Sequence, residues 1–114
     1  MSVGEHLRVG VRNHADTAVV HLDGELDLAS APVFESELQR AEVAGAARVV
    51  LDLRDLQFVD SAGLRMIVTA HTHARERGQE FAVTRGPEQV QRLLAITRIG
   101  EHLRIIDAPE ELAP

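Results

Sequence analysis

The most constraining feature of this sequence is the place where a strand-like pattern changes into a helix-like one. An apolar run at residues 49–53 is followed by the segment FVDSAGL at residues 58–64, and an amphipathic run begins at Leu64. In parallel α/β folds, such a strand-to-helix junction lies at the carboxyl edge of the sheet, where ligands and partners usually bind. The sequence therefore places the Ser61 hydroxyl beside the Asp60 carboxylate at the start of a helix.

The rest of the sequence alternates between strand-like and helix-like patterns. Strands are predicted at residues 6–12, 17–22, 47–53, 81–83 and 103–106. Helices are predicted at residues 30–45, 61–77 and from 87 to just before 100, with Ser or Pro near each start and Gly at each end. Helical spacing in the second of them predicts a buried stripe of Leu64, Ile67, Val68 and His71.

This order predicts an α/β fold in a single small domain over residues 1–114. The first two strands are joined by a short polar turn at residues 13–16, which indicates an antiparallel hairpin. The later strands alternate with helices, and right-handed crossovers place those helices mainly on one face. We therefore expect a mostly parallel sheet with an antiparallel edge strand, followed by a frayed tail at residues 108–114.

Composition argues against several classes of function. The net charge of −6 disfavours nucleic acid and anionic membranes, because both bind basic surfaces. With 3% aromatic residues and no cysteine, the chain offers few rings for base stacking and neither a disulfide nor thiol chemistry. No apolar run approaches the roughly 18 residues of a membrane span. We expect a cytoplasmic protein without cofactor, whose partner is a protein with a basic surface.

Ser61 has both a structural and a functional interpretation. Asp and Ser are preferred at helix starts, where their side chains accept hydrogen bonds from free backbone N–H groups. A phosphate on Ser61 would face the positive end of the helix dipole and add about 1.5 to 2 negative charges to the surface. A nucleophilic role is disfavoured, because the G-x-S-x-G turn is absent and the spacing places no histidine beside Ser61.

Two further groups of residues are candidate metal-binding or partner-binding sites. Four carboxylates are expected near the carboxyl edge of the sheet: Asp23, Asp27, Asp55 and Asp60. They could hold Mg²⁺ together with a substrate phosphate, form an acidic rim for an Arg-bearing partner, or serve singly in turns and caps. His71 and His73 do not form a metal pair, because residues two apart on a helix point about 200° apart.

Three motifs resemble those of a known family. The segments VVLDL at residues 49–53 and FVDSAGL at residues 58–64 resemble the core motif of STAS domains, and more narrowly of the bacterial anti-sigma factor antagonists. GELD at residues 24–27 matches their earlier motif at the expected distance. The resemblance covers nearly the whole chain. One departure is Ala62, where many members carry a second serine.

The resemblance implies a switching mechanism. In the family, the serine after the motif Asp is phosphorylated by a partner that is both anti-sigma factor and serine kinase. The unphosphorylated antagonist binds that partner and frees the sigma factor, and a serine phosphatase resets it. Carried over, Ser61 is the phosphate acceptor and Asp60 helps to present it. The expected partner-binding residues are Asp23, Asp27, Asp60, Ser61, Gly63, Leu64 and Arg65, with Leu64 and Arg65 on the docking surface.

Two alternatives remain open at this point. The chain could be a STAS scaffold subunit of a sensory complex or of a lipid-transport assembly, and the retained Asp60-Ser61 pair favours the switching role over this one. It could also be a small serine hydrolase. The absence of the G-x-S-x-G turn and of a histidine base argues against this role.

Overall fold

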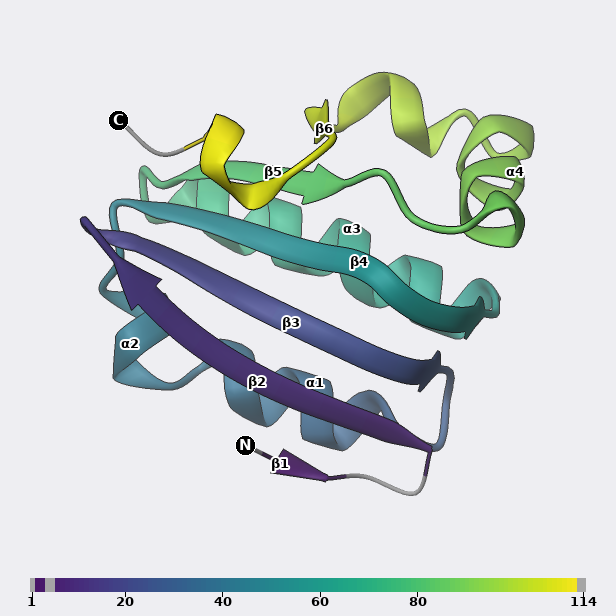
Figure 1. Ribbon diagram of the computed structural model, residues 1–114, viewed down its shortest axis with the longest axis horizontal. Coiled ribbons are helices and arrows are strands. Elements are labelled where there is room, and N and C mark those ends of the chain that lie inside the picture. Colours follow the sequence, from purple (N-terminus) through teal and green to yellow (C-terminus); the bar gives the residue numbers. More distant parts are fainter. Residues whose placement is uncertain (1, 4–5, 113–114) are drawn as a thin grey trace.

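Six strands form one sheet in the part of the chain that the computed structural model describes, residues 2–3 and 6–112. They follow one another across the sheet in chain order (Figure 1). The strands are β1 (Ser2–Val3), β2 (Leu7–His14), β3 (Thr17–Leu26), β4 (Arg48–Val59), β5 (Glu80–Thr84) and β6 (Ile105–Ile106). β1–β2 and β2–β3 pair antiparallel, and the three later pairs are parallel. The expected mostly parallel sheet with an antiparallel edge is confirmed.

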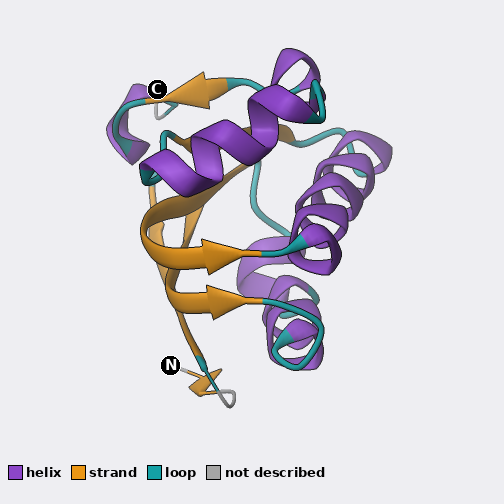
Figure 2. Cartoon of the chain, turned by 90° about the vertical axis from the view of Figure 1, so that its right-hand side faces the viewer, coloured by secondary structure: helices purple, strands orange, loops and turns teal. Residues whose placement is uncertain are grey.

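The helices lie mainly on one face of this sheet, as expected. They are α1 (Ala31–Leu38), α2 (Ala41–Ala44), α3 (Ser61–Glu76) and α4 (Glu88–Ile96), with short 3₁₀ helices η1 (Ile99–His102) and η2 (Pro109–Glu111). α1 and α3 cover the same face (Figure 2). The predicted helix at residues 30–45 is broken at Gln39 and Arg40, so α1 and α2 are separate.

Strand alternation divides the buried side chains between the two faces. Val20, Leu51 and Val83 point to the helices and share one core with Phe34 of α1 and Ile67 of α3. On the opposite face, a second and smaller cluster comprises Val19, Val50, Ala82, Ile106 and Leu112. Because both faces of the central strands are buried, the apolar runs in β3 and β4 are nearly continuous.

Two expectations about residue placement are wrong. The buried residues of α3 are Gly63, Leu64, Ile67, Ala70 and Ala74. Val68 and His71 are only partly buried, and the His71 ring lies against the Phe81 ring with centroids 5.4 Å apart. A stripe assigned from large side chains overlooked the small ones, Gly63, Ala70 and Ala74.

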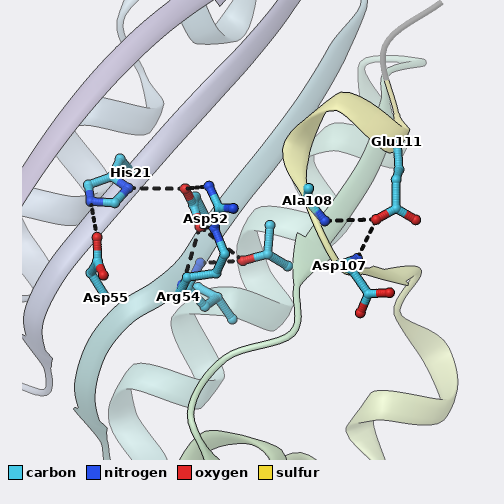
Figure 3. Close-up of polar contacts among 9 residues, drawn as sticks. His21, Asp52, Arg54, Asp55, Asp107, Ala108 and Glu111 are labelled. Atoms are coloured by element: carbon cyan, nitrogen blue, oxygen red, sulfur yellow. Dashed lines mark hydrogen bonds and ion pairs between the residues drawn. The ribbon is translucent and has the colours of Figure 1, made fainter.

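The segment at residues 108–112 is not frayed. Leu112 is buried against the far face of the sheet, and residues 113–114 lie outside the described residues. The Glu111 carboxylate accepts hydrogen bonds from the backbone N–H groups of Asp107 and Ala108, both at 2.8 Å (Figure 3). These bonds satisfy free donors at the start of η2, and they hold the segment in place.

β3 and β4 extend beyond their predicted ends, to Leu26 and Val59. Irregular pairing after His21 and after Gly24 interrupts the alternation on which the prediction rested. Gly24 has a φ of +114°, and a Cβ there would collide with the His6 carbonyl oxygen. The longer strands place Asp23 and Asp55 inside the sheet, where they pair in register, and not in the loops that follow it.

Candidate site at the carboxyl edge of the sheet

Ser61 is the first residue of α3, and its side chain is exposed. The capping role belongs to Asp60, whose Oδ1 accepts a 2.8 Å hydrogen bond from the Gly63 N–H. Asp60 itself is extended, with φ −97° and ψ −175°, as capping residues usually are. Among the described residues, no hydrogen bond engages the Ser61 hydroxyl. The hydroxyl is therefore presented to solvent at a helix start that another side chain caps.

A close backbone contact fixes the start of α3 against the end of β3. A Cβ on Gly63 would clash with the Leu26 carbonyl oxygen, so glycine is required at this approach. The same oxygen accepts a 3.3 Å hydrogen bond from the Asp60 N–H. Ser61 thus lies beside the turn that leaves β3.

That turn is held by reciprocal hydrogen bonds between Asp27 and Ser30. The Ser30 N–H donates to Asp27 Oδ1 at 3.0 Å, and the Asp27 N–H donates to Ser30 Oγ at 2.9 Å. Ser30 is fully buried, and its hydroxyl also donates to the Glu25 carbonyl. Between them Leu28 is 74% exposed. The turn is rigid through its polar groups and presents an apolar side chain to solvent.

β4 ends beyond its pairing with β5, and a side chain takes the place of the missing strand. Gln89 of α4 accepts a hydrogen bond from the Val59 N–H at 3.1 Å and donates one to the Val59 carbonyl at 3.0 Å. The neighbouring Phe58 is 41% exposed. Gln89, Leu28 and Phe58 were not predicted as parts of this edge. The sequence offered a signal for two of them, because Leu28 directly follows the GELD motif and Phe58 opens FVDSAGL.

The structure brings together some of the predicted partner-binding residues. Asp27, Asp60, Ser61 and Arg65 lie at the carboxyl edge and are partly or fully exposed. Gly63 and Leu64 are buried, Leu64 with 4% of its surface exposed. The expectation that Leu64 lies on the docking surface is wrong, because it opens the inward-facing stripe of α3 and packs into the core.

Asp23 and Asp55 are placed away from Ser61, so the four predicted carboxylates do not form one rim. Both lie within strands, and Asp55 Oδ2 is 2.9 Å from Nε2 of His21 (Figure 3). Within the described residues, no three His, Asp or Glu side chains are placed to hold a metal ion. The Mg²⁺ interpretation gains no support from this arrangement.

A buried polar network on the sheet face away from α1 and α3 was not predicted as a site. Asp52 is 2% exposed, and its carboxylate contacts His21 Nδ1 at 3.1 Å and Arg54 Nε at 2.9 Å. A second Arg54 nitrogen lies 2.9 Å from the other carboxylate oxygen (Figure 3). The Thr84 hydroxyl donates to Asp52 at 3.1 Å. A charged residue inside the apolar run VVLDL was the sequence signal for this network.

The network keeps Asp52 ionised. Burial disfavours the charged form, but hydrogen bonds from Arg54 and His21 outweigh it and hold the pKa of the Asp52 carboxyl well below its usual range. The pKa of Arg54 is raised in turn, chiefly by its hydrogen bond to Asp52. Every acceptor position of this carboxylate is directed at a partner within the protein, which indicates a structural role.

Comparisons with known proteins agree with this geometry. A family model described as STAS domain matches residues 8–112. The chain is 29% identical to the anti-sigma F factor antagonist of Paenibacillus polymyxa, over 90% of this chain and 88% of that protein. Its fold is similar to the crystal structure of an anti-sigma factor antagonist from Mycobacterium paratuberculosis, with TM-score 0.84, 20% identity and coverage of 97% and 94%.

A further solved structure is that of the Bacillus cell fate determinant SpoIIAA in the phosphorylated form. It has a TM-score of 0.70 and 16% identity, and the match covers 92% of this chain and 96% of that one. At this identity the likeness concerns the fold. No helix in the described residues is long and apolar enough to cross a membrane.

Proposed function

Because this chain belongs to the STAS domain family, we propose that it is a cytoplasmic anti-sigma factor antagonist. It binds, in its unphosphorylated form, an anti-sigma factor that is also a serine kinase, and the sigma factor is thereby released. Phosphorylation of Ser61 by that kinase ends the interaction, and a serine phosphatase restores it. The chain itself catalyses no reaction, and its single domain carries the whole switch.

The observation that carries this proposal is the free Ser61 hydroxyl at a helix start capped by Asp60. Because the cap does not depend on Ser61, a phosphate can be added without removing a structural hydrogen bond. The new charge would lie at the positive end of the α3 dipole, where anions are stabilised by about 0.3–1 kcal/mol. The domain can therefore keep its fold in both states.

The surroundings of Ser61 suit a docking surface. Leu28 and Phe58 expose apolar surface at the edge where β3 and β4 end, while Asp27, Asp60 and Arg65 supply charge. Gly63 and Leu64 support this surface from below by fixing α3 against β3. Asp23 lies in β3 away from this surface, and we assign it no contact with the partner.

A phosphate at this edge would act by obstructing contact. A kinase must bring its active site to Ser61, so the same surface is buried in the complex. A dianionic phosphate there must lose its hydration, which is costly without a matching cation. A 100-fold loss of affinity corresponds to only about 2.7 kcal/mol.

The test has two steps. The purified chain is incubated with the candidate kinase and ATP, and phosphate is mapped by peptide mass; we expect one phosphate, on Ser61, and none on Ser61→Ala. Calorimetry then compares the unmodified, phosphorylated, Ser61→Ala and Ser61→Asp forms. We expect tight binding by the first and third, about 100-fold weaker binding after phosphorylation, and an intermediate loss for Ser61→Asp.

Three outcomes would contradict the proposal. They are phosphate uptake undiminished in Ser61→Ala, equal affinity of the modified and unmodified forms, and an affinity loss that accompanies collapse of the melting transition. A stable complex without any phosphate uptake would favour the scaffold role. A hydrolase role gains no support, because in the described part of the chain no histidine forms a hydrogen bond with Ser61.

A further inference from the structure

A cavity lies between α3 and the α1–α2 segment, on the helix-covered side of the sheet. Its volume is about 240 Å³, and the sheet contributes Val49 and Phe81 to its lining. The cavity does not include Ser61 or the network around Asp52, so it is separate from both regions described above.

Small side chains on α3 and the short first helix create this space. One wall is formed by Met66, Ala70 and His73 of α3 and by Arg77, which caps the end of that helix; these residues recur every three or four positions. Ala70 and Ala74 leave room where larger residues would fill the gap to Leu38 of α1. The space is therefore a consequence of the sequence of α3.

The far end of the cavity is closed by a side-chain amide. Gln79 donates hydrogen bonds to the carbonyl oxygens of Val43 and Ala46, each at 2.8 Å. The Val43 carbonyl lies near the end of α2, and the Ala46 carbonyl follows that helix. The Gln79 amide supplies the hydrogen bonds that these carbonyls lack at the helix end. The cavity thus has a fixed wall where α2 meets the strand that follows it.

The charges at the rim are arranged along the length of the cavity. Arg77 and His73 line the cavity at the C-terminal end of α3. Glu35 of α1 lines the part of the cavity nearer Met66. Arg77 forms no ion pair with any side chain in the described residues. The stripe from Met66 to Arg77 spans eleven residues, or about 16 Å of helix. An anionic group is favoured at the Arg77 end and disfavoured near Glu35. Leu38, Val49, Met66 and Phe81 offer apolar contacts to a chain between these ends.

We infer that this cavity binds a small amphiphile, namely an unbranched alkyl carboxylate of about eight carbons, with its carboxylate at Arg77 and its chain directed toward Met66. The size follows from the volume, because a cavity of about 150 Å³ accommodates benzene, so 240 Å³ suits roughly ten non-hydrogen atoms. The lining runs along the chain from Met66 to Arg77, which favours an extended ligand over a ring. The ligand would lie between α1 and α3, both of which begin at the edge that carries Ser61.

The experiment uses the full chain and sodium octanoate. Calorimetry should give a dissociation constant of about 0.1–1 mM. This is the value expected for a ligand of about ten non-hydrogen atoms with a modest binding free energy per atom. In methyl NMR spectra the signals of Met66, Ala70 and Ala74 should move. From hexanoate to octanoate the affinity should rise about fourfold per methylene, and the gain should stop near the length that fills the cavity.

Matched variants test the predicted orientation. Arg77→Gln should weaken octanoate about fivefold, whereas Arg75→Gln, an exposed residue of the same helix outside the lining, should change it less than twofold. Octan-1-ol should bind both variants equally, because it carries no charge. Ala70→Leu should abolish binding by filling the space; if its melting transition is lost, the Arg77 and Arg75 pair decides alone.

The inference would be overturned by unchanged methyl signals up to about 5 mM octanoate, which excludes useful affinity. Equal effects of Arg77→Gln and Arg75→Gln would also overturn it, as would an affinity that keeps rising with chain length beyond decanoate. The latter is the behaviour of non-specific association with apolar surface. None of these results bears on phosphorylation of Ser61, so the proposed function is tested separately.

Discussion

The edge around Ser61 and the network around Asp52 use the same kinds of side chains for opposite purposes. At the edge, a hydroxyl and two apolar side chains are left exposed while the backbone beneath them is tightly held. In the network, the Asp52 carboxylate is buried and is contacted by His21, Arg54 and Thr84. The comparison indicates that substitutions at the edge should change binding, whereas substitutions in the network should change stability.

The largest expected effect is that of Asp52→Ala on stability. The substitution leaves the fully buried Thr84 hydroxyl without its acceptor, and an unpaired buried polar group costs about 1–3 kcal/mol. The loss of the Arg54 ion pair adds little, because Arg54 is 46% exposed. Urea unfolding should show the loss of stability, while the fraction that remains folded should bind the anti-sigma partner normally. Asp55→Ala is the control: its side chain is 61% exposed, so its cost should be below about 1 kcal/mol. Similar costs for the two variants would remove the distinction between buried and exposed carboxylates.

The opposite result is expected at the edge, for Leu28→Ser. Leu28 is 74% exposed, so stability should not change, but partner affinity should fall about 10-fold to 30-fold if Leu28 is buried in the complex. The matched control is Ile96→Ser, which removes an equally exposed side chain, about 10 Å along α4 from Gln89. Surface plasmon resonance measures both. Equal losses of affinity would show that the docking surface extends well beyond the edge.

Acid should weaken the network in a characteristic range. The folded pKa of Asp52 lies below its unfolded value, so its contribution is complete above the ordinary carboxyl pKa near 4 and is lost as pH falls below that value toward the folded pKa. Each pH unit in this range should remove about 1.4 kcal/mol of stability. The stability difference between the natural chain and Asp52→Asn, measured by urea unfolding, should therefore shrink below about pH 4. A constant difference would contradict the assigned role.

The smallest expected effect joins the two regions, because Asp60 is a structural residue at the functional edge. Asp60→Ala removes the hydrogen bond to the Gly63 N–H and should cost about 1 kcal/mol of stability. Arg65→Ala, a nearby exposed substitution without a capping role, should leave the melting temperature nearly unchanged. If Asp60→Ala also left the melting temperature unchanged, the cap would contribute nothing to stability. The remaining role of Asp60 would then be in binding the partner.

Much of the fold could be predicted because it depends on local patterns. The strand-to-helix change at Asp60 placed the start of α3 correctly, and the short turn before Thr17 placed the hairpin. The ends of β3 and β4 could not be predicted, because the irregular pairing near Gly24 depends on the backbone of His6, which lies beside it in the sheet. The tail was misjudged for a similar reason, since Leu112 is held by a sheet face far away in sequence.

The candidate site was predicted only where one motif contained it. Ser61 and Asp60 are adjacent, so their roles at a helix start follow from the sequence alone. Helical spacing predicted Leu64 in the buried stripe of α3, whereas the family resemblance placed it on the docking surface. The buried position of Leu64 supports the spacing. The partners of Asp52 come from three strands, and only the register brings His21 and Thr84 beside it.

The chain-order sheet also bears on how the molecule assembles during synthesis. Since each strand pairs only with its neighbours in sequence, no strand has to wait for a distant segment before it finds its place. Once Glu76 has left the ribosome, β2, β3, β4 and α3 are available, and the Asp60 cap beside Ser61 can form before Gln89 of α4 joins this edge. The hydrogen bond from the Thr84 hydroxyl to Asp52 can form only after β5 has been synthesised. The nascent chain can thus present Ser61 before the network around Asp52 is complete.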